Sequence, residues 1–230
     1  MTAIAIDGPA GAGKSTIAER IAEELGYLYI DTGALYRAIG LFMLENGADA
    51  ADPKQVCPLL KKISVSLEYQ NKNLKVILNG NDVSSKIRSE EVSTASSKVS
   101  AIPEVRKFLI DVQRNLAEKD NVVMDGRDIG TVVLPNAQVK IFLTASPEDR
   151  ARRRFEEMIQ KGIKSDYNDV LNDMKQRDYR DIHRAISPLK AAEDAIKIDT
   201  TDNTFEQSVK LVIQIIRRSL SKKSSGNGMS

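Results

Sequence analysis

A glycine-rich segment near the start of the chain has the residues and spacing of a phosphate-binding loop. Residues 8–15 read Gly-Pro-Ala-Gly-Ala-Gly-Lys-Ser, a complete G-x-x-x-x-G-K-[ST] pattern. In such a loop, backbone N–H groups surround phosphate oxygens, and the N-terminus of the following helix adds partial positive charge. We expect Lys14 to reach the β- and γ-phosphates of a nucleotide and Ser15 to hold Mg²⁺. The predicted nucleotide-binding residues are Gly8, Pro9, Ala10, Gly11, Ala12, Gly13, Lys14, Ser15 and Thr16.

The sequence on either side supplies the elements that this loop needs. Residues 3–6 form a short apolar run, which is typical of a buried strand. After the loop, Ile17, Ile21 and Leu25 recur at helical spacing, and Gly26 then marks a helix end. Strand, loop and helix therefore follow one another in the order that phosphate binding requires. The alternative is a glycine-rich turn that follows a strand by chance.

Composition limits the class of protein. The 230 residues include 34 Lys or Arg and 32 Asp or Glu, giving a formal net charge of +2, which argues against a dominant nucleic-acid surface. The single cysteine, Cys57, excludes an internal disulfide and fits a reducing compartment. The chain shows no signal peptide and no apolar run long enough to span a bilayer. We therefore expect a cytoplasmic protein without a membrane partner.

Apolar runs alternate with helical stretches along most of the chain. After the first strand, further strands are predicted at residues 27–31, 122–125, 139–143 and 195–199, and a closing helix is predicted to begin near 203–204. This alternation predicts an α/β fold with a five-stranded parallel sheet flanked by helices. Because ligands bind beyond the carboxyl ends of such strands, Asp31 and Asp125 are expected near a ligand.

Two segments interrupt the alternation of strands and helices. Between Ile63 and Val83, apolar residues at every second position predict a small antiparallel meander with turns at 71–73 and 79–82. The segment from Ser146 to Pro188 is rich in arginines that are nearly balanced by acids. It could be a solvated helical pair with many ion pairs, or a mobile lid that closes over phosphates. We favour the lid, because the segment follows a strand whose end should face the ligand.

The remaining motifs separate the classes of protein that use such a loop. A GTPase would carry D-x-x-G and N-K-x-D, and neither pattern occurs. A mechanical ATPase usually has two adjacent acidic residues at the end of an apolar strand. Here the two acids, Asp125 and Asp128, are separated by an arginine, Arg127. An arginine at this edge suits a second phosphorylated molecule, because a guanidinium group matches phosphate oxygens. Further arginines that could form a phosphate cage are Arg37, Arg106 and Arg184. These features favour a kinase whose acceptor is already anionic.

Four motifs together resemble those of the bacterial cytidylate kinases. They are residues 8–16, residues 31–37 (Asp-Thr-Gly-Ala-Leu-Tyr-Arg), residues 125–133 (Asp-Gly-Arg-Asp-Ile-Gly-Thr-Val-Val) and Arg177-Asp178-x-Arg180-Asp181. They occur in the family's order, and the resemblance runs from Ile4 to about Leu189. It implies the P-loop nucleoside-monophosphate-kinase fold, with an inserted NMP-binding subdomain containing a small antiparallel sheet and with a short helical lid. It also implies transfer of the γ-phosphoryl group of ATP, with Mg²⁺, to CMP or dCMP.

The same resemblance implies a role for each site residue. Lys14, Arg127 and Arg184 would be the catalytic residues, and Arg37, Arg127 and Arg184 would hold the acceptor phosphate. Ser97, Arg106 and Asp128 would read the cytosine, with Thr32 near the same pocket, where many relatives have serine. Arg177 and Asp181 would meet the sugar hydroxyls. Ser93, Ser96 and Ser100 are alternatives to Ser97.

The expected organisation and partners follow from these assignments. The expected parts are core 1–34, NMP-binding insert 35–100, core 101–147, lid 148–187, core 188–221 and disordered tail 222–230. The expected partners are ATP and CMP or dCMP, without nucleic acid, and we expect a monomer. Two other functions stay open. One is a kinase for another nucleoside monophosphate, a sugar or an aromatic acid, and the other is a nucleotide-dependent module that binds nucleic acid through the basic segment.

Overall fold

The computed structural model describes residues 1–70 and 73–226, and the chain divides into two units. The first unit comprises Met1–Ile30 and Asp120–Ser230, and the second comprises Asp31–Lys119. Within the described residues, no helix is both long enough and apolar enough to span a bilayer.

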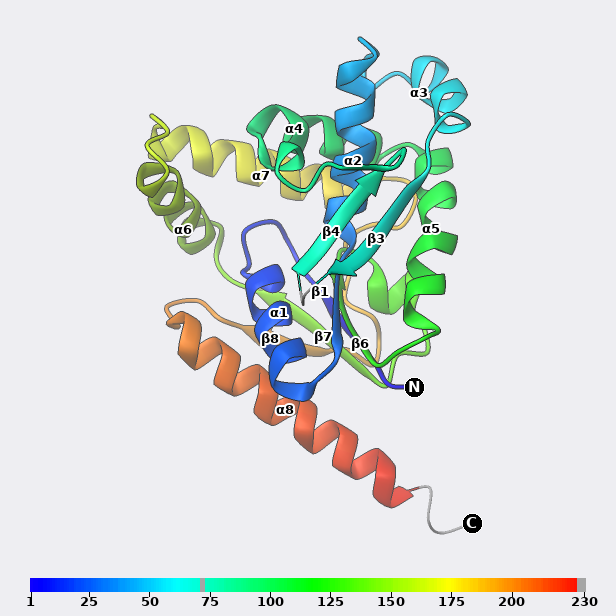
Figure 1. Ribbon diagram of the computed structural model, residues 1–230. Coiled ribbons are helices and arrows are strands. Elements are labelled where there is room, and N and C mark those ends of the chain that lie inside the picture. Colours follow the sequence, from blue (N-terminus) through cyan, green and yellow to red (C-terminus); the bar gives the residue numbers. More distant parts are fainter. Residues whose placement is uncertain (71–72, 227–230) are drawn as a thin grey trace. The chain divides into compact units, whose positions relative to one another are not determined.

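A five-stranded parallel sheet forms the centre of the first unit (Figure 1). Across the sheet, the order is β2 (Leu28–Asp31), β6 (Val122–Gly126), β1 (Ala3–Asp7), β7 (Val139–Thr144) and β8 (Ile196–Asp199). The central strand β1 pairs with β6 and β7, so that Ile6 lies opposite both Asp125 and Ile141. The carboxyl ends of β1 and β6 therefore lie next to each other. The five strands and their shared direction confirm the sheet that the sequence predicted.

Two helices lie side by side against this sheet, α1 (Lys14–Leu25) and α8 (Phe205–Gly226) (Figure 1). Their apolar faces form one buried core with the strands; it includes Ile4, Ile6, Ile17, Ile21, Ile141, Val209, Val212 and Ile216. The backbone of α8 continues through Gly226, past the start of the tail expected at residue 222. Serine and lysine are tolerated in a helix, so their presence alone does not end it. Residues 227–230, the rest of that expected tail, lie outside the described residues.

The first unit also contains the arginine-rich segment from Ser146 to Pro188, which we call the charged segment. It forms α6 (Pro147–Gln160) and α7 (Tyr167–His183), which pack through Ala151, Val170 and Met174. Phe155 and Tyr167 add an edge-to-face contact, with ring centroids 6.2 Å apart. A short π-helical turn, η2 (Ile129–Val133), follows β6. The segment is thus a helical pair with its own small apolar core.

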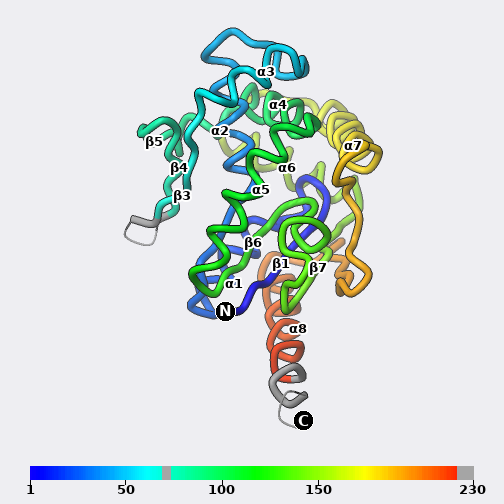
Figure 2. The backbone as a smooth tube through the Cα atoms, turned by 90° about the vertical axis from the view of Figure 1, so that its right-hand side faces the viewer, coloured from blue at the N-terminus to red at the C-terminus, as the bar shows by residue number. Residues whose placement is uncertain are grey.

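Helices and a small meander form the second unit. Its helices are α2 (Thr32–Glu45), α3 (Pro53–Leu60), η1 (Lys86–Arg88), α4 (Glu90–Val99) and α5 (Pro103–Ala117). The strands β3 (Val65–Gln70), β4 (Asn73–Leu78) and β5 (Asn81–Asp82) pair antiparallel and lie beside α2 (Figure 2). This confirms the predicted meander, although residues 71–72 of its first predicted turn lie outside the described part of the chain.

The second unit is larger than the insert at 35–100 that the sequence suggested. Helix α5 belongs to this unit and packs on α2 and α3. Close packing of α2 on α4 depends on Gly40, because a Cβ atom there would lie 2.8 Å from the backbone nitrogen of Ser96. These inter-helix contacts join segments that are far apart in the sequence, so a composition change could not mark the boundary.

We predict that Gly8→Ala destabilises the fold far more than Gly26→Ala. Both glycines have a positive φ, but a Cβ atom on Gly8 would lie 1.9 Å from the carbonyl oxygen of Leu143, whereas one on Gly26 would meet nothing within 4 Å. Urea unfolding should show a loss of more than about 3 kcal/mol for Gly8→Ala. For Gly26→Ala the loss should be about 1–2 kcal/mol. Equal losses in the two variants would contradict the close approach of the loop to β7.

Candidate functional site

The predicted phosphate-binding loop connects β1 to α1 in the first unit. Gly11 and Gly13 adopt φ values of 71° and 78°, a left-handed conformation that glycine adopts without steric cost. Gly13 is also the N-cap of α1, so the loop ends at the positive end of a helix. The glycines therefore allow the backbone shape that an anion-binding loop needs.

Lys14 is buried at the base of this loop, although it is a charged residue. Its Nζ donates a hydrogen bond to the carbonyl oxygen of Pro9 at 2.7 Å. Burial and the nearby positive charge of Arg127 lower the pKa of Lys14 to about 7, against the opposing effects of Asp125 and Asp7. A bound anion would offset both lowering effects, because it would stabilise the protonated ammonium group.

Ser15 is linked to the end of the neighbouring strand β6. Its hydroxyl donates to Oδ2 of Asp125 at 2.9 Å, and the hydroxyl of Tyr29 donates to Oδ1 of the same carboxylate at 2.9 Å. Asp125 is 4% exposed. The pairing of β1 with β6 thus places a hydroxyl and a carboxylate oxygen together at the start of α1.

Asp7 connects the end of β1 to the segment that follows β6. Its two carboxylate oxygens each accept a hydrogen bond of 2.7 Å, one from the backbone N–H of Ile129 and one from that of Gly130. Burial raises the pKa of Asp7 to about 6, although these two bonds act in the opposite direction. Asp7 therefore fixes the backbone directly after Arg127 and Asp128.

Two predicted acceptor residues, Arg127 and Asp128, join a charged cluster with α7. The Nε of Arg127 donates to Oδ2 of Asp181 at 3.0 Å. Arg184, at the end of α7, lies 3.8 Å from Asp128 and 3.9 Å from Asp181. Burial opposes ionisation of Asp181, but Arg127, Arg177 and Arg184 outweigh it and hold the pKa of that carboxyl below its usual range.

The arginines of the charged segment have different surroundings. Arg150 and Arg153 donate to backbone carbonyl groups of Ala10 and Thr200 at 2.8 and 2.7 Å. Arg154 instead pairs with Glu157 on the exposed side of α6. The segment therefore contains ion pairs, and hydrogen bonds to backbone carbonyls hold it to other parts of the first unit.

In the second unit, the predicted residues surround the start of α2. Asp31 caps α2 by accepting from the N–H of Ala34 at 3.0 Å, and it pairs with Arg37 at 2.5 Å. A Cβ atom on Gly33 would lie 3.0 Å from this arginine and 3.1 Å from this aspartate. The Asp-Thr-Gly sequence thus caps the helix and leaves room for the ion pair. Thr32, between the two motif residues, is buried.

The predicted base-reading residues of the second unit lie on α4 and α5. The guanidinium group of Arg106 is 5.5 Å from the centroid of the Tyr36 ring and donates to the carbonyl oxygen of Ser100 at 3.2 Å. Ser96 is buried beside Gly40, whereas Ser97 is half-buried. Arg106 is buried, so its contacts with Tyr36 and Ser100 hold its guanidinium group within this unit.

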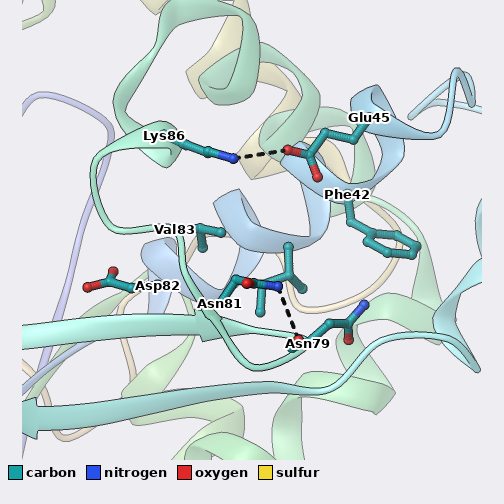
Figure 3. Close-up of a pocket in the computed structure, with 8 residues that line it drawn as sticks. Phe42, Glu45, Asn79, Asn81, Asp82, Val83 and Lys86 are labelled. Carbon is teal, nitrogen blue, oxygen red and sulfur yellow. Dashed lines mark hydrogen bonds and ion pairs between the residues drawn. The ribbon is translucent and has the colours of Figure 1, made fainter.

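A separate pocket of about 320 Å³ in the second unit contains none of the predicted site residues (Figure 3). Asn81 and Asn79 lie on one side, where the Nδ2 of Asn81 donates to the carbonyl oxygen of Asn79 at 3.3 Å. Lys86 faces Glu45 at 3.9 Å on the other. Asn79 and Asp82 make their other side-chain hydrogen bonds and ion pairs with residues outside the lining, such as Ser64 and Lys75.

The sequence missed three residues that this geometry brings into the sites. Asp7 and Tyr29 hold the motif at 125–130, and Tyr36 underlies Arg106. A carboxylate directly before a glycine-rich loop was a visible signal for Asp7. No sequence pattern indicates that Tyr29 reaches Asp125, because 96 residues separate them.

Comparisons with known proteins give one consistent result. Residues 4–218 match the family model described as cytidylate kinase. The chain is 53% identical over 215 residues to a cytidylate kinase of Caldanaerobacter subterraneus subsp. tengcongensis, covering 94% of each chain. It is 50% identical over 215 residues to that of Carboxydothermus hydrogenoformans, covering 94% of this chain and 97% of that one.

One solved structure has a similar fold at low sequence identity. An uncharacterized protein from Eubacterium ventriosum ATCC 27560 aligns with a TM-score of 0.52 and 14% identity, covering 94% of this chain and 99% of that one. This likeness concerns the fold alone.

We predict that Asp7 makes stability fall as pH rises from about 4 to about 6. Its folded-state pKa is raised above the ordinary value of 3.8 to about 6, so the folded protein binds more protons than the unfolded chain in this range. The contribution is fully present below the unfolded pKa and amounts to about 3 kcal/mol. Asp7→Asn, which is neutral throughout, should lack it.

Urea unfolding of both proteins between pH 4 and 7 tests this prediction. The free energy of unfolding of the parent should fall relative to that of Asp7→Asn across the window. Two curves that stay parallel would show that Asp7 does not titrate there.

Proposed function

Because the chain belongs to the cytidylate kinase family, we propose that it transfers the γ-phosphoryl group of ATP to CMP or dCMP. The observation that carries this proposal is the direct link between a complete phosphate-binding loop and the Asp125–Asp128 motif. Ser15 bonds to Asp125, and Arg127 and Asp128 follow directly in a cluster with Asp181 and Arg184. In this proposal the donor-binding loop follows β1, and Arg127 and Asp128 follow the neighbouring strand β6.

The donor phosphates are assigned to residues 8–16. We propose that Lys14 contacts the β- and γ-phosphates, because its buried ammonium group lies inside the loop. Phosphoryl transfer needs positioning and charge stabilisation more than covalent chemistry by the protein. The acceptor oxygen of CMP is already ionised at neutral pH, so no strong general base is required.

The neighbourhood of Ser15 fits Mg²⁺. Its hydroxyl and the Asp125 carboxylate present hard oxygen ligands 2.9 Å apart. In the described residues, no group of three or more His, Cys, Asp or Glu could bind a metal ion. Mg²⁺ commonly uses one or two protein ligands together with nucleotide phosphates and water, so this smaller set suffices. The ion would offset negative charge on the phosphates, and Ser15 and Asp125 would hold it.

The acceptor phosphate is assigned to Arg37, Arg127 and Arg184. Each now pairs with a carboxylate at 2.5 to 3.9 Å, and a phosphate can compete for the same guanidinium donors. Of these, Arg127 and Arg184 join Lys14 as the proposed catalytic residues. Charge from all three would oppose the negative charge that develops during transfer.

The nucleoside is assigned to the remaining predicted residues. We propose that Asp128, Arg106 and Ser97 read the cytosine, with Thr32 nearby, and that Arg177 and Asp181 meet the sugar hydroxyls. The Asp128 carboxylate can accept from the exocyclic amine of cytosine. Uracil presents an oxygen at that position, which cannot donate a hydrogen bond to the carboxylate and would face its negative charge.

The segment 148–187 is proposed to act as a lid. Lid closure over the phosphates would exclude water that otherwise hydrolyses ATP. The assigned residues all belong to one chain, so a monomer suffices. The intracellular substrates and the single cysteine support a cytoplasmic location.

A panel of acceptors tests the proposed function directly. Purified protein is incubated with ATP, Mg²⁺ and CMP, dCMP, UMP, AMP, shikimate or gluconate, and ADP release is measured. CMP and dCMP should give the highest kcat/KM. Release that depends on another acceptor would transfer the assignment to that substrate, and salt-sensitive RNA binding without acceptor-dependent release would favour a nucleic-acid-binding module.

We predict that Lys14→Ala lowers kcat with CMP at least about a hundredfold, the scale of losing one transition-state charge contact. Lys210→Ala, which changes an exposed lysine of α8, should leave kcat unchanged. Circular dichroism should show that both variants are folded. Near-normal turnover by folded Lys14→Ala would refute the assignment of Lys14.

We predict that Asp128→Ala lowers the CMP-to-UMP ratio of kcat/KM by at least about tenfold, because it removes the acceptor for the cytosine amine. The KM for ATP should change much less. Asp128→Asn, which keeps the side-chain volume near Arg184, should give an intermediate ratio. An unchanged ratio in both variants would remove Asp128 from base recognition.

A further inference from the structure

The motif Arg177-Asp178-x-Arg180-Asp181 contains an aspartate to which the proposed reaction assigns no role. Asp178 accepts a hydrogen bond of 2.7 Å from the Nη2 of Arg150, in α6. The side chain of Arg150 is 3% exposed and that of Asp178 is 14% exposed. An arginine this deeply buried costs stability unless its donors are satisfied, so its partners indicate what it does.

The other two partners of Arg150 are backbone carbonyl groups. Its Nε donates to Ala145 at 2.9 Å, which fixes the guanidinium group to the end of β7. Its Nη1 donates to Ala10 at 2.8 Å, inside the phosphate-binding loop. One planar group therefore connects the sheet, the loop and α7.

The bond to Ala10 sets the direction of one loop amide. A trans peptide unit is planar, so the carbonyl of Ala10 and the N–H of Gly11 point in opposite directions. By holding the carbonyl oxygen on the side of α6 and α7, Arg150 turns the N–H of Gly11 away from those helices. A carbonyl turned the other way would present negative charge to a phosphate.

Packing around Gly11 independently holds the same peptide in place. Gly11 has a φ of 71°, and a Cβ atom there would lie 2.5 Å from Cε of Met174 and 3.4 Å from Cβ of Arg150. Met174 belongs to α7, one helical turn before Asp178. The tip of the loop is thus pressed against both helices of the charged segment.

The position of α7 matters for the acceptor groups as well. Arg177 and Asp181 lie on this helix, and Arg184 is its C-cap. A bond to Asp178 therefore restrains the helix that carries them. We infer that Arg150 is a positioning residue that orients the Ala10–Gly11 peptide for the donor phosphates and aligns α7 with the phosphate-binding loop. This inference rests on the proposed role of the loop in ATP binding.

A second ion pair between the same two helices provides a matched control. Lys175 of α7 lies 3.2 Å from Glu148 of α6, and both side chains are more than half exposed. This pair joins the helices without reaching the loop. Loss of the pair should be nearly neutral, because exposed ion pairs contribute little.

The test compares Arg150→Met, Arg150→Lys and Lys175→Met by calorimetric ATP binding without acceptor and by steady-state kinetics. Arg150→Met should weaken ATP binding and raise the KM for ATP at least about tenfold, since three bonds of a buried charged group are lost. The KM for CMP should also rise, but less than the KM for ATP, because Asp178 restrains the helix that carries Arg177, Asp181 and Arg184. Arg150→Lys should recover part of the ATP affinity, and Lys175→Met should match the parent.

Normal ATP affinity and KM in Arg150→Met, with only a lower melting temperature, would overturn the inference in favour of a purely structural ion pair. If Arg150→Met does not fold, Arg150→Lys decides: a weaker ATP affinity supports the inference, and parental affinity overturns it. ATP binding is measured without acceptor, so it remains informative if CMP is not the substrate. Failure of the parent to release ADP with CMP would contradict the proposed function instead.

Discussion

Burial of charge at the carboxyl edge of the sheet is the constraint on which the sites depend. Asp7, Asp125 and Asp128 lie within or directly after β1 and β6, Lys14 begins α1, and each of the four is at most 5% exposed. An isolated buried charge costs several kcal/mol, so each needs a compensating partner. Backbone N–H groups compensate Asp7, and two hydroxyls compensate Asp125. Hydrogen bonds to these buried charges therefore hold the surrounding backbone in place, in addition to packing.

This compensation remains incomplete around Lys14. The pKa of its ammonium group is lowered to about 7, because the effects of burial and Arg127 outweigh those of Asp125 and Asp7. A phosphate bound as proposed would supply the negative charge that offsets both lowering effects. Binding and catalysis would then draw on the same electrostatic imbalance, since charge stabilisation is the main requirement of phosphoryl transfer.

Two arginines of the charged segment join α6 to other parts of the first unit. Arg150 and Arg153 pair with Asp178 and Asp149 and also donate to the backbone carbonyls of Ala10 and Thr200. Arg37, Arg127 and Arg184 face carboxylates, whose place a phosphate can take. The contacts of Arg150 and Arg153 thus describe the charged segment as a helical pair with ion pairs, and its action as a lid stays a proposal.

The sequence by itself determined the parallel sheet, the meander and the phosphate-binding loop, because these depend on local periodicity and on glycine spacing. It also placed Arg127 and Asp128 at a strand end, since a motif and an apolar run are both local. Tertiary structure alone decided that Asp7 holds Ile129 and Gly130, that Tyr29 reaches Asp125 and that Arg150 reaches Ala10. It likewise assigned α5 to the second unit. The physical reason is distance along the chain: strand pairing and helix packing bring together groups separated by about 100 residues, and no local pattern encodes which of them meet.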